Sequence, residues 1–283
     1  MEQVSYSVYR ATIDQIMLGQ EKLPSLPDIT LKIRQEAANP NTTIDRLAEM
    51  IAADPSLTVM LMRYACSPLY RTQQTPKSLD TAIGLLGIPS VDRLIMLHSV
   101  KSLFIMQSPK LKKLFNIAWQ RQTLKAATSR FLAQKLGFNP PDEALIACLL
   151  SEIGTLAILS ALTDAKEVPS QQVYFRLCRE YSKSLGVIIL KKWSLDNRYA
   201  EIVRHCGDWT QATGQQLSVT DIINLALYHT IALLKKDHNL PDIESLPAYQ
   251  KLPPPFNQVG KNGLLHLVNA NLKDIVGVAR SLH

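Results

Sequence analysis

The stretch "TIDRLAEMIAADPSLTVMLMRYAC", residues 43–66, contains the patterns of two amphipathic helices and of the turn between them. Ile44, Leu47 and Ile51 share one face of the first helix, because residues three or four apart are neighbours on a helix surface. Asp54-Pro55 then offers a side-chain N-cap followed by a proline at the first helical position, which predicts that a second helix starts there. Two apolar stripes joined by a turn this short favour helices that pack against each other.

The same signals recur along the rest of the chain. Serines precede two further segments, so that Ser78 is expected to cap a helix ending at Gly87 and Ser90 a helix over 91–104. A long helix is predicted over 114–137, and Pro140-Pro141 begins a buried helix that contains "LLSEIGTLAIL", residues 149–159. The later predicted helices cover 171–195, 197–206, 219–237, 261–268 and 270–281. The sequence therefore predicts an all-α fold.

Composition narrows the class of protein. The 283 residues are 46% hydrophobic, and the net charge of +7 is a mild bias for a chain of this length. The four cysteines are widely spaced and form no C-x-x-C pair, which argues against a zinc ribbon or a disulfide framework and favours a cytoplasmic protein with reduced thiols. The apolar run around Glu152 approaches a membrane-spanning length, but a carboxylate near its middle favours a buried core helix without membrane insertion.

The order of motifs from Leu23 to Asp208 resembles the HDOD domain, a relative of HD-type metal phosphohydrolases. The matching motifs are Leu-Pro-x-Leu-Pro from residue 23, Asp54-Pro55-Ser56-Leu57, Ser67-Pro68-Leu69-Tyr70, and the helix from Ser78 to Gly87. Cys66 departs from the family's usual asparagine. The resemblance implies an HD-domain-like multi-helix bundle. We expect a leading helix over 1–22, the domain over 23–215 with an N-terminal layer (23–115) and a degenerate HD-like bundle (116–215), and a C-terminal helical extension over 216–283 packed on the core.

The resemblance also implies where a metal site would lie. HD phosphohydrolases hold divalent metals with histidines and a His-Asp doublet, and the metal activates a water for attack on phosphorus. The corresponding positions here are Arg121, Ser151, Glu152, Ser182, Cys206 and Gly207, with His205 adjacent to the last pair. Too few of these side chains are metal ligands to form a coordination shell. We therefore expect no metal, no cofactor and no catalytic residue at this site, as in an inactive relative of the enzymes.

Two interpretations of Arg121 remain open. In the first, Arg121 and Glu152 form a buried ion pair, extended to Ser151 or His205, which links the two helices that a metal would have joined. In the second, Arg121, together with Lys125, presents positive charge to an anionic ligand. We favour the ion pair, because Glu152 would neutralise the arginine.

Charge and the resemblance together order the functional hypotheses. No acidic residue occurs from Arg93 to Pro141, which fits a solvated face, an acidic protein partner or nucleic acid. Nucleic acid is the weakest of these, because no helix-turn-helix or aromatic-interleaved basic motif is present. The favoured hypothesis is a non-enzymatic signal-transduction module that binds a sensor, a response regulator or a component of a cyclic-di-nucleotide system, alone or as a homodimer. The alternatives are a metal-dependent phosphohydrolase and a nucleic-acid-binding regulator.

Overall fold

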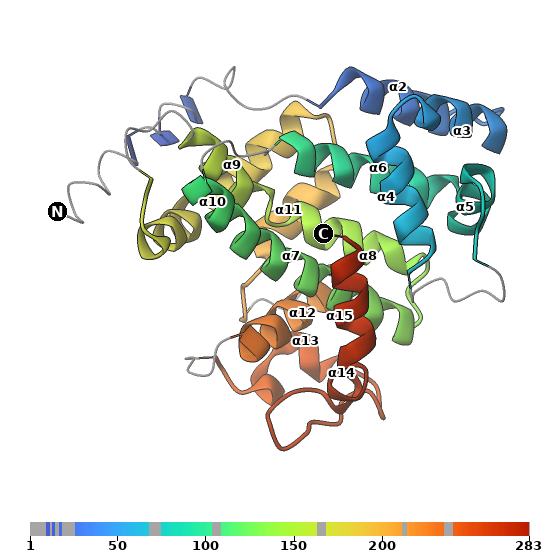
Figure 1. Ribbon diagram of the computed structural model, residues 1–283. Helices are drawn as coiled ribbons and strands as arrows, with labels where there is room; N and C mark the ends of the chain where they lie inside the picture. The colour runs from blue at the N-terminus through green and yellow to red at the C-terminus, as the bar shows by residue number, and fades with distance from the viewer. Residues whose placement is uncertain are drawn as a thin grey trace.

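The computed structural model is a bundle of α-helices arranged in three groups along the chain (Figure 1). It describes residues 10–11, 13–14, 17–18, 26–67, 75–103, 109–162, 168–210, 214–234 and 240–282. Within these residues, β structure is limited to one isolated bridge between Val259 and Leu265. The predicted all-α fold is confirmed. Most of the predicted leading helix and of the Leu-Pro-x-Leu-Pro motif, as well as Pro68 to Tyr70, lies outside the described residues.

The N-terminal layer comprises α2 (Asp28–Ala37), α3 (Ile44–Ala52), α4 (Pro55–Ala65), α5 (Leu79–Leu86) and α6 (Ile88–Leu103). Two of its helix starts follow the predicted caps: the Asp54 carboxylate accepts from the Ser56 amide at 2.8 Å, and Ser78 forms a capping box with Thr81. The prediction that Ser90 caps the next helix is wrong. That helix already begins at Ile88, because a proline at the following position is tolerated in a first turn, where its missing N–H is not needed.

The central bundle comprises α7 (Pro109–Lys135), α8 (Pro141–Leu150), α9 (Ile153–Ala161), α10 (Gln171–Lys192) and α11 (Asn197–His205). The long helix α7 crosses the molecule and contacts α8, α9, α12 and α15 (Figure 1). The prediction of one continuous buried helix through 149–159 is wrong, since the chain breaks at Ser151-Glu152. There the Ser151 hydroxyl donates to the Cys148 carbonyl at 2.7 Å, and Glu152 leaves helical geometry with φ −115° and ψ 16°. The break directs two polar residues into the bundle.

Helices α9 and α10 approach each other closely at Gly154. A β-carbon at this position would lie 1.8 Å from the carbonyl oxygen of Ser182 and 2.9 Å from the amide of Gly186. Only glycine fits, because no side-chain atom can occupy that gap between two backbones. The contact fixes the start of α9, and with it the Ser151-Glu152 break, against the middle of α10.

The C-terminal residues form α12 (Val219–Leu234), a 3₁₀ turn (Ile243–Ser245), α13 (Pro247–Gln250), α14 (His266–Ala270) and α15 (Leu272–Ser281). They bury a second hydrophobic core against the end of α7, with Leu132, Ile222 and Leu265 fully buried. The predicted helix over 261–268 is wrong in its start, which is His266. The preceding residues turn instead, since Gly260 N–H donates to the Leu264 carbonyl at 2.8 Å and Leu265 N–H donates to His229 Nε2 at 3.0 Å.

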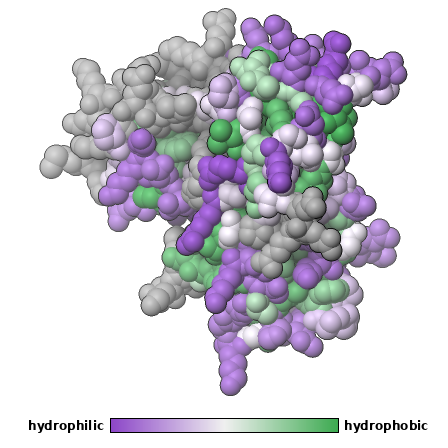
Figure 2. All heavy atoms as spheres, turned by 45° about the vertical axis from the view of Figure 1, so that its right-hand side comes forward, coloured by the Kyte–Doolittle hydropathy of each residue, from purple (hydrophilic) through white to green (hydrophobic). Residues whose placement is uncertain are grey.

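The most apolar part of the chain lies inside this fold. Residues Pro141–Ala161 are long enough to span a membrane and contain an 18-residue window with a mean hydropathy of 2.0. Yet 78% of that window is buried within the protein, and the break at Ser151-Glu152 divides the segment. Burial by the protein's own helices supports a core segment. On the face shown in Figure 2, hydrophobic residues occur in small areas among hydrophilic ones.

Candidate functional site

A cavity of about 680 Å³ lies where α7, α10 and the break between α8 and α9 meet. Six of the seven positions proposed from the sequence line it: Arg121, Ser151, Glu152, Ser182, Cys206 and Gly207. The seventh, His205, does not, and its Nε2 instead lies 3.5 Å from a carboxylate oxygen of Glu201, one turn earlier on the same helix. The α10 wall is made by Gln172, Phe175, Cys178, Arg179, Ser182 and Lys183, a spacing that places them on one helix face.

Lys125 is buried behind the cavity wall and contacts three of the residues that line it. Its side chain has no exposed surface, and its Nζ donates to Ser151 Oγ at 3.0 Å, to Cys206 Sγ at 3.6 Å, and to the Glu152 carboxylate. The expected Arg121–Glu152 ion pair is not formed: the partner of Glu152 is Lys125. The same contacts remove Lys125 from the expected anion-binding role, because all of its charge is directed inward.

The pKa values of both partners show a pair that stays ionised. Burial lowers the pKa of the Lys125 ammonium, but its interactions with Cys206 and Glu152 outweigh burial and leave that pKa above its ordinary value. Burial raises the pKa of the Glu152 carboxyl, and the nearby positive charges of Lys125 and Arg121 outweigh burial and leave it lowered. The buried carboxylate and ammonium therefore persist as a charged pair at neutral pH.

Arg121 lies next to this pair but is not satisfied by it. Its Nε is buried and has no hydrogen-bond partner. Two more cations line the cavity from α10, where Arg179 and Lys183 are exposed. Lys183 donates to the Arg204 carbonyl at 2.9 Å, a contact that leaves its charge unbalanced. With Glu152 matched by Lys125, the walls carry an excess of positive charge.

These residues do not fit a divalent metal. Nowhere in the described ranges do three His, Cys, Asp or Glu side chains gather closely enough to hold a metal ion. In the cavity, the atoms of metal-ligating type are those of Glu152, Cys178 and Cys206. Burial raises the pKa of Cys178 to about 12, so its sulfur carries a proton, whereas metals bind thiolate. The ammonium of Lys125 bonds both Glu152 and Cys206, which puts a fixed positive charge where a metal would need to approach.

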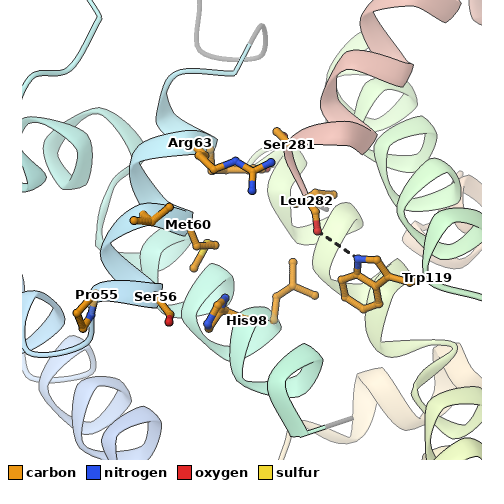
Figure 3. Close-up of a pocket in the computed structure, with 11 residues that line it drawn as sticks. Pro55, Ser56, Met60, Arg63, His98, Trp119, Ser281 and Leu282 are labelled. Carbon is orange, nitrogen blue, oxygen red and sulfur yellow. Dashed lines mark hydrogen bonds between the residues drawn. The ribbon is translucent and has the colours of Figure 1, made fainter. Parts of the chain in front are cut away.

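A second cavity, of about 420 Å³, lies between α4, α6, α7 and the end of α15 (Figure 3). Its walls are mainly apolar, with Met60, Leu97 and Trp119 among them. The Trp119 indole donates to the Leu282 carbonyl at 3.2 Å, and the Arg63 guanidinium, which points toward the end of α15, donates to the Arg280 carbonyl at 3.5 Å. The cavity therefore lies between the N-terminal layer, α7 and the C-terminal helix, and these hydrogen bonds hold the end of α15 against its walls. This cavity was not predicted from the sequence, because its walls come from four separate segments of the chain.

Comparisons with known proteins agree with the fold and the motifs. The family model of the HDOD domain matches residues 23–208. A structure from Shewanella amazonensis, provisionally described as a metal-dependent phosphohydrolase, is 18% identical with a TM-score of 0.74, over 96% of this chain and 100% of the other. An HDOD domain protein of unknown function from Geobacter sulfurreducens is 19% identical with a TM-score of 0.67, over 100% and 99%.

A third structure, from Marinobacter aquaeolei, is provisionally described as a signal transduction protein. It is 16% identical with a TM-score of 0.57, over 98% of this chain and 64% of the other. No protein with a curated description matches this chain. At these identities the structures show a shared fold, and the family model covers about two thirds of the sequence. The predicted resemblance is confirmed: the chain belongs to the HDOD domain family.

Proposed function

We propose that this protein is a non-enzymatic regulatory module that works in the cytoplasm by binding a signalling protein. The observation that carries the proposal is the position of Lys125, whose buried ammonium bonds Ser151, Glu152 and Cys206. These are three of the positions that the resemblance assigns to the metal ligands of HD enzymes. A buried ammonium repels a divalent cation at short range, so this arrangement disfavours a metal at the same carboxylate. Family membership and the fold shared with the Marinobacter protein support a regulatory role.

The phosphohydrolase alternative rests on the Shewanella neighbour. That likeness concerns the fold, and a fold carries its chemistry only when the site residues are kept. Metal analysis of the purified protein decides between the two. We expect less than stoichiometric manganese, iron or magnesium, and no hydrolysis of phosphodiesters or phosphomonoesters. A bound metal at one equivalent, together with turnover that Glu152→Gln abolishes, would establish the enzyme instead.

The cavity in Figure 3 is the surface that best suits a protein partner. Its lining includes Val59, which is 57% exposed, and the exposed side chain of Arg63, which lies one helical turn later on α4. An apolar recess with a cation at its edge suits a partner segment that presents an apolar side chain next to a carboxylate. The mildly basic charge of the whole chain favours the same acidic class of partner.

The partner surface is tested by comparing what two variants capture from the native cell extract. Val59→Asp places a charge at the rim of the cavity, whereas Leu31→Asp makes the same change at a 42% exposed position on α2, outside it. We expect a specific partner to be retained by the wild type and by Leu31→Asp and lost by Val59→Asp. A partner that both variants retain equally would show that the binding surface lies outside this cavity.

A further inference from the structure

The cavity around Arg121 has more positive charge than its own carboxylate can balance. Lys125 already neutralises Glu152, which leaves Arg121, Arg179 and Lys183 as a group of three cations on facing walls. In the described part of the chain, neither arginine has a hydrogen-bond or ion-pair partner, and the Nε of Arg121 is buried. A buried guanidinium donor without an acceptor is unfavourable, and a bound anion would supply the acceptor.

A second, apolar compartment adjoins the charged one. It has a volume of about 270 Å³ and is lined by Ile117, Gln120, Arg121, Gln171, Phe175, Ile231 and Leu234. Arg121 and Phe175 line both compartments. A cationic cavity and an apolar one are thus adjacent, with an aromatic ring and a guanidinium at their common boundary. A ligand that fills both must combine an anionic end with an apolar, ring-like end.

We propose that this double cavity binds an organic phosphate, namely a phosphate ester carried by a planar ring and of about the size of a mononucleotide. The phosphate would lie between Arg121 and Arg179, since guanidinium groups match phosphate oxygens in charge and geometry. The planar group would pack against Phe175 in the apolar compartment. The main volume of about 680 Å³ is within the usual range of ligand cavities, roughly 300–1,000 Å³. The inference shares with the proposed function the premise that Lys125 excludes a metal, so binding must be independent of metal.

Calorimetric titration in the presence of a chelator tests the inference. The probes are adenosine 5′-monophosphate, phenyl phosphate, adenosine and inorganic phosphate. We expect the nucleotide to bind at least tenfold more tightly than adenosine or inorganic phosphate, because only the joined molecule reaches both compartments. Arg121→Met and Arg179→Met should each weaken nucleotide binding at least tenfold. Arg176→Met, the same change at an exposed position of α10 outside the cavity, should leave it within twofold.

Arg179 is exposed, so its substitution tests the site even where the partly buried Arg121 variant fails to fold. Phe175→Leu should reduce the preference of the site for the nucleotide over inorganic phosphate. Binding of neither phosphate ester, or equal binding by wild type and Arg179→Met, would overturn the inference. The partner-capture comparison with Val59→Asp uses the other cavity, so a negative titration leaves the proposed function standing. Nucleotide binding that requires an added divalent metal, or nucleotide hydrolysis, would overturn both.

Discussion

Replacing Glu152 by leucine leaves the Lys125 ammonium buried without a counter-charge, and the size of the effect can be worked from the pair itself. The ammonium has no exposed surface, so the folded variant avoids a stranded charge by releasing a proton. From the ordinary lysine pKa of 10.5, this costs about 1.4 kcal/mol for each pH unit below that value. The electrostatic loss is therefore bounded at about 5 kcal/mol at pH 7 and at about 2 kcal/mol at pH 9.

The sign of the pH dependence follows from the same reasoning. In the Glu152→Leu variant the pKa of Lys125 is depressed in the folded state, so the unfolded state binds more protons below pH 10.5. Stability of the variant should thus rise with pH, and its deficit relative to wild type should shrink from pH 7 to pH 9. A merely steric role for Glu152 gives a deficit that does not change with pH.

The reverse substitution, Lys125→Met, strands the carboxylate instead. Protonating it at pH 7 from an ordinary pKa of 4.5 costs at most about 3 kcal/mol, and the neighbouring Arg121 reduces this. The double variant, Lys125→Met with Glu152→Leu, removes both charges and should lose less than the sum of the two single changes. We expect a coupling of about 2 kcal/mol or more.

Urea unfolding of the four proteins at pH 7 and pH 9 measures these quantities. The matched control is a second double-mutant cycle, in which Arg121→Met takes the place of Lys125→Met. Arg121 lies on the same face of α7 as Lys125 but forms no hydrogen bond to Glu152. That cycle should show a smaller coupling. A Lys125 coupling below about 0.5 kcal/mol, or a larger one in the Arg121 cycle, would refute the assignment of the pair.

Three further predictions concern the scaffold. Burial lowers the pKa of His229 to about 4 from the ordinary 6.5, so the free energy of unfolding should be constant with respect to this group above pH 6.5 and should fall by about 3 kcal/mol as the pH drops toward 4. In His229→Gln, the free energy of unfolding measured in urea should change less over that pH interval. An equal pH dependence in the variant and the wild type would contradict this. Gly154→Ala would place a β-carbon 1.8 Å from the Ser182 carbonyl oxygen and should lower the free energy of unfolding by about 2 kcal/mol or more. The control Gly84→Ala, whose β-carbon would lie 3.7 Å from Ile44 Cδ1, should be neutral or stabilising. Equal thermal midpoints for the two variants would count against the close contact at Gly154. Asp142→Asn removes the charge facing Arg130, whose side chain is 4% exposed, and should lower the free energy of unfolding by roughly 3–5 kcal/mol. Glu143→Gln, at the more exposed pair with Arg198, should lower it by less than about 1 kcal/mol. Similar losses in the two variants would show that burial does not govern the strength of these pairs.

Local signals predicted most of the helices, because a cap acts within one turn. The side chains of Asp54 and Ser78 accept hydrogen bonds from amides two or three residues ahead, so these caps can be predicted from residue spacing alone. The break at Ser151-Glu152 could not be predicted from the sequence. Its neighbours are strongly apolar, and the helix is interrupted where Gly154 meets the backbone of α10, a contact between residues far apart in sequence.

The residues of the candidate site were likewise predicted only in part. The resemblance located six positions that do line one cavity. It could not choose between Arg121 and Lys125 as the partner of Glu152, since the two are one turn apart on the same helix face and differ only in depth. Phe175 and Arg179 were missed, although their spacing of four residues on α10 is the signal that would have placed them together.

The position of Lys125 also constrains how this chain can evolve. Histidines introduced at the positions of Arg121, Ser182 and Gly207 would still face an ammonium bonded to Glu152 and Cys206. Removing the ammonium first would leave the Glu152 carboxylate without its partner, a step that we expect to lower the stability of the fold. A metal site could therefore arise at this cavity only through a change that first weakens the contact between α7 and the start of α9.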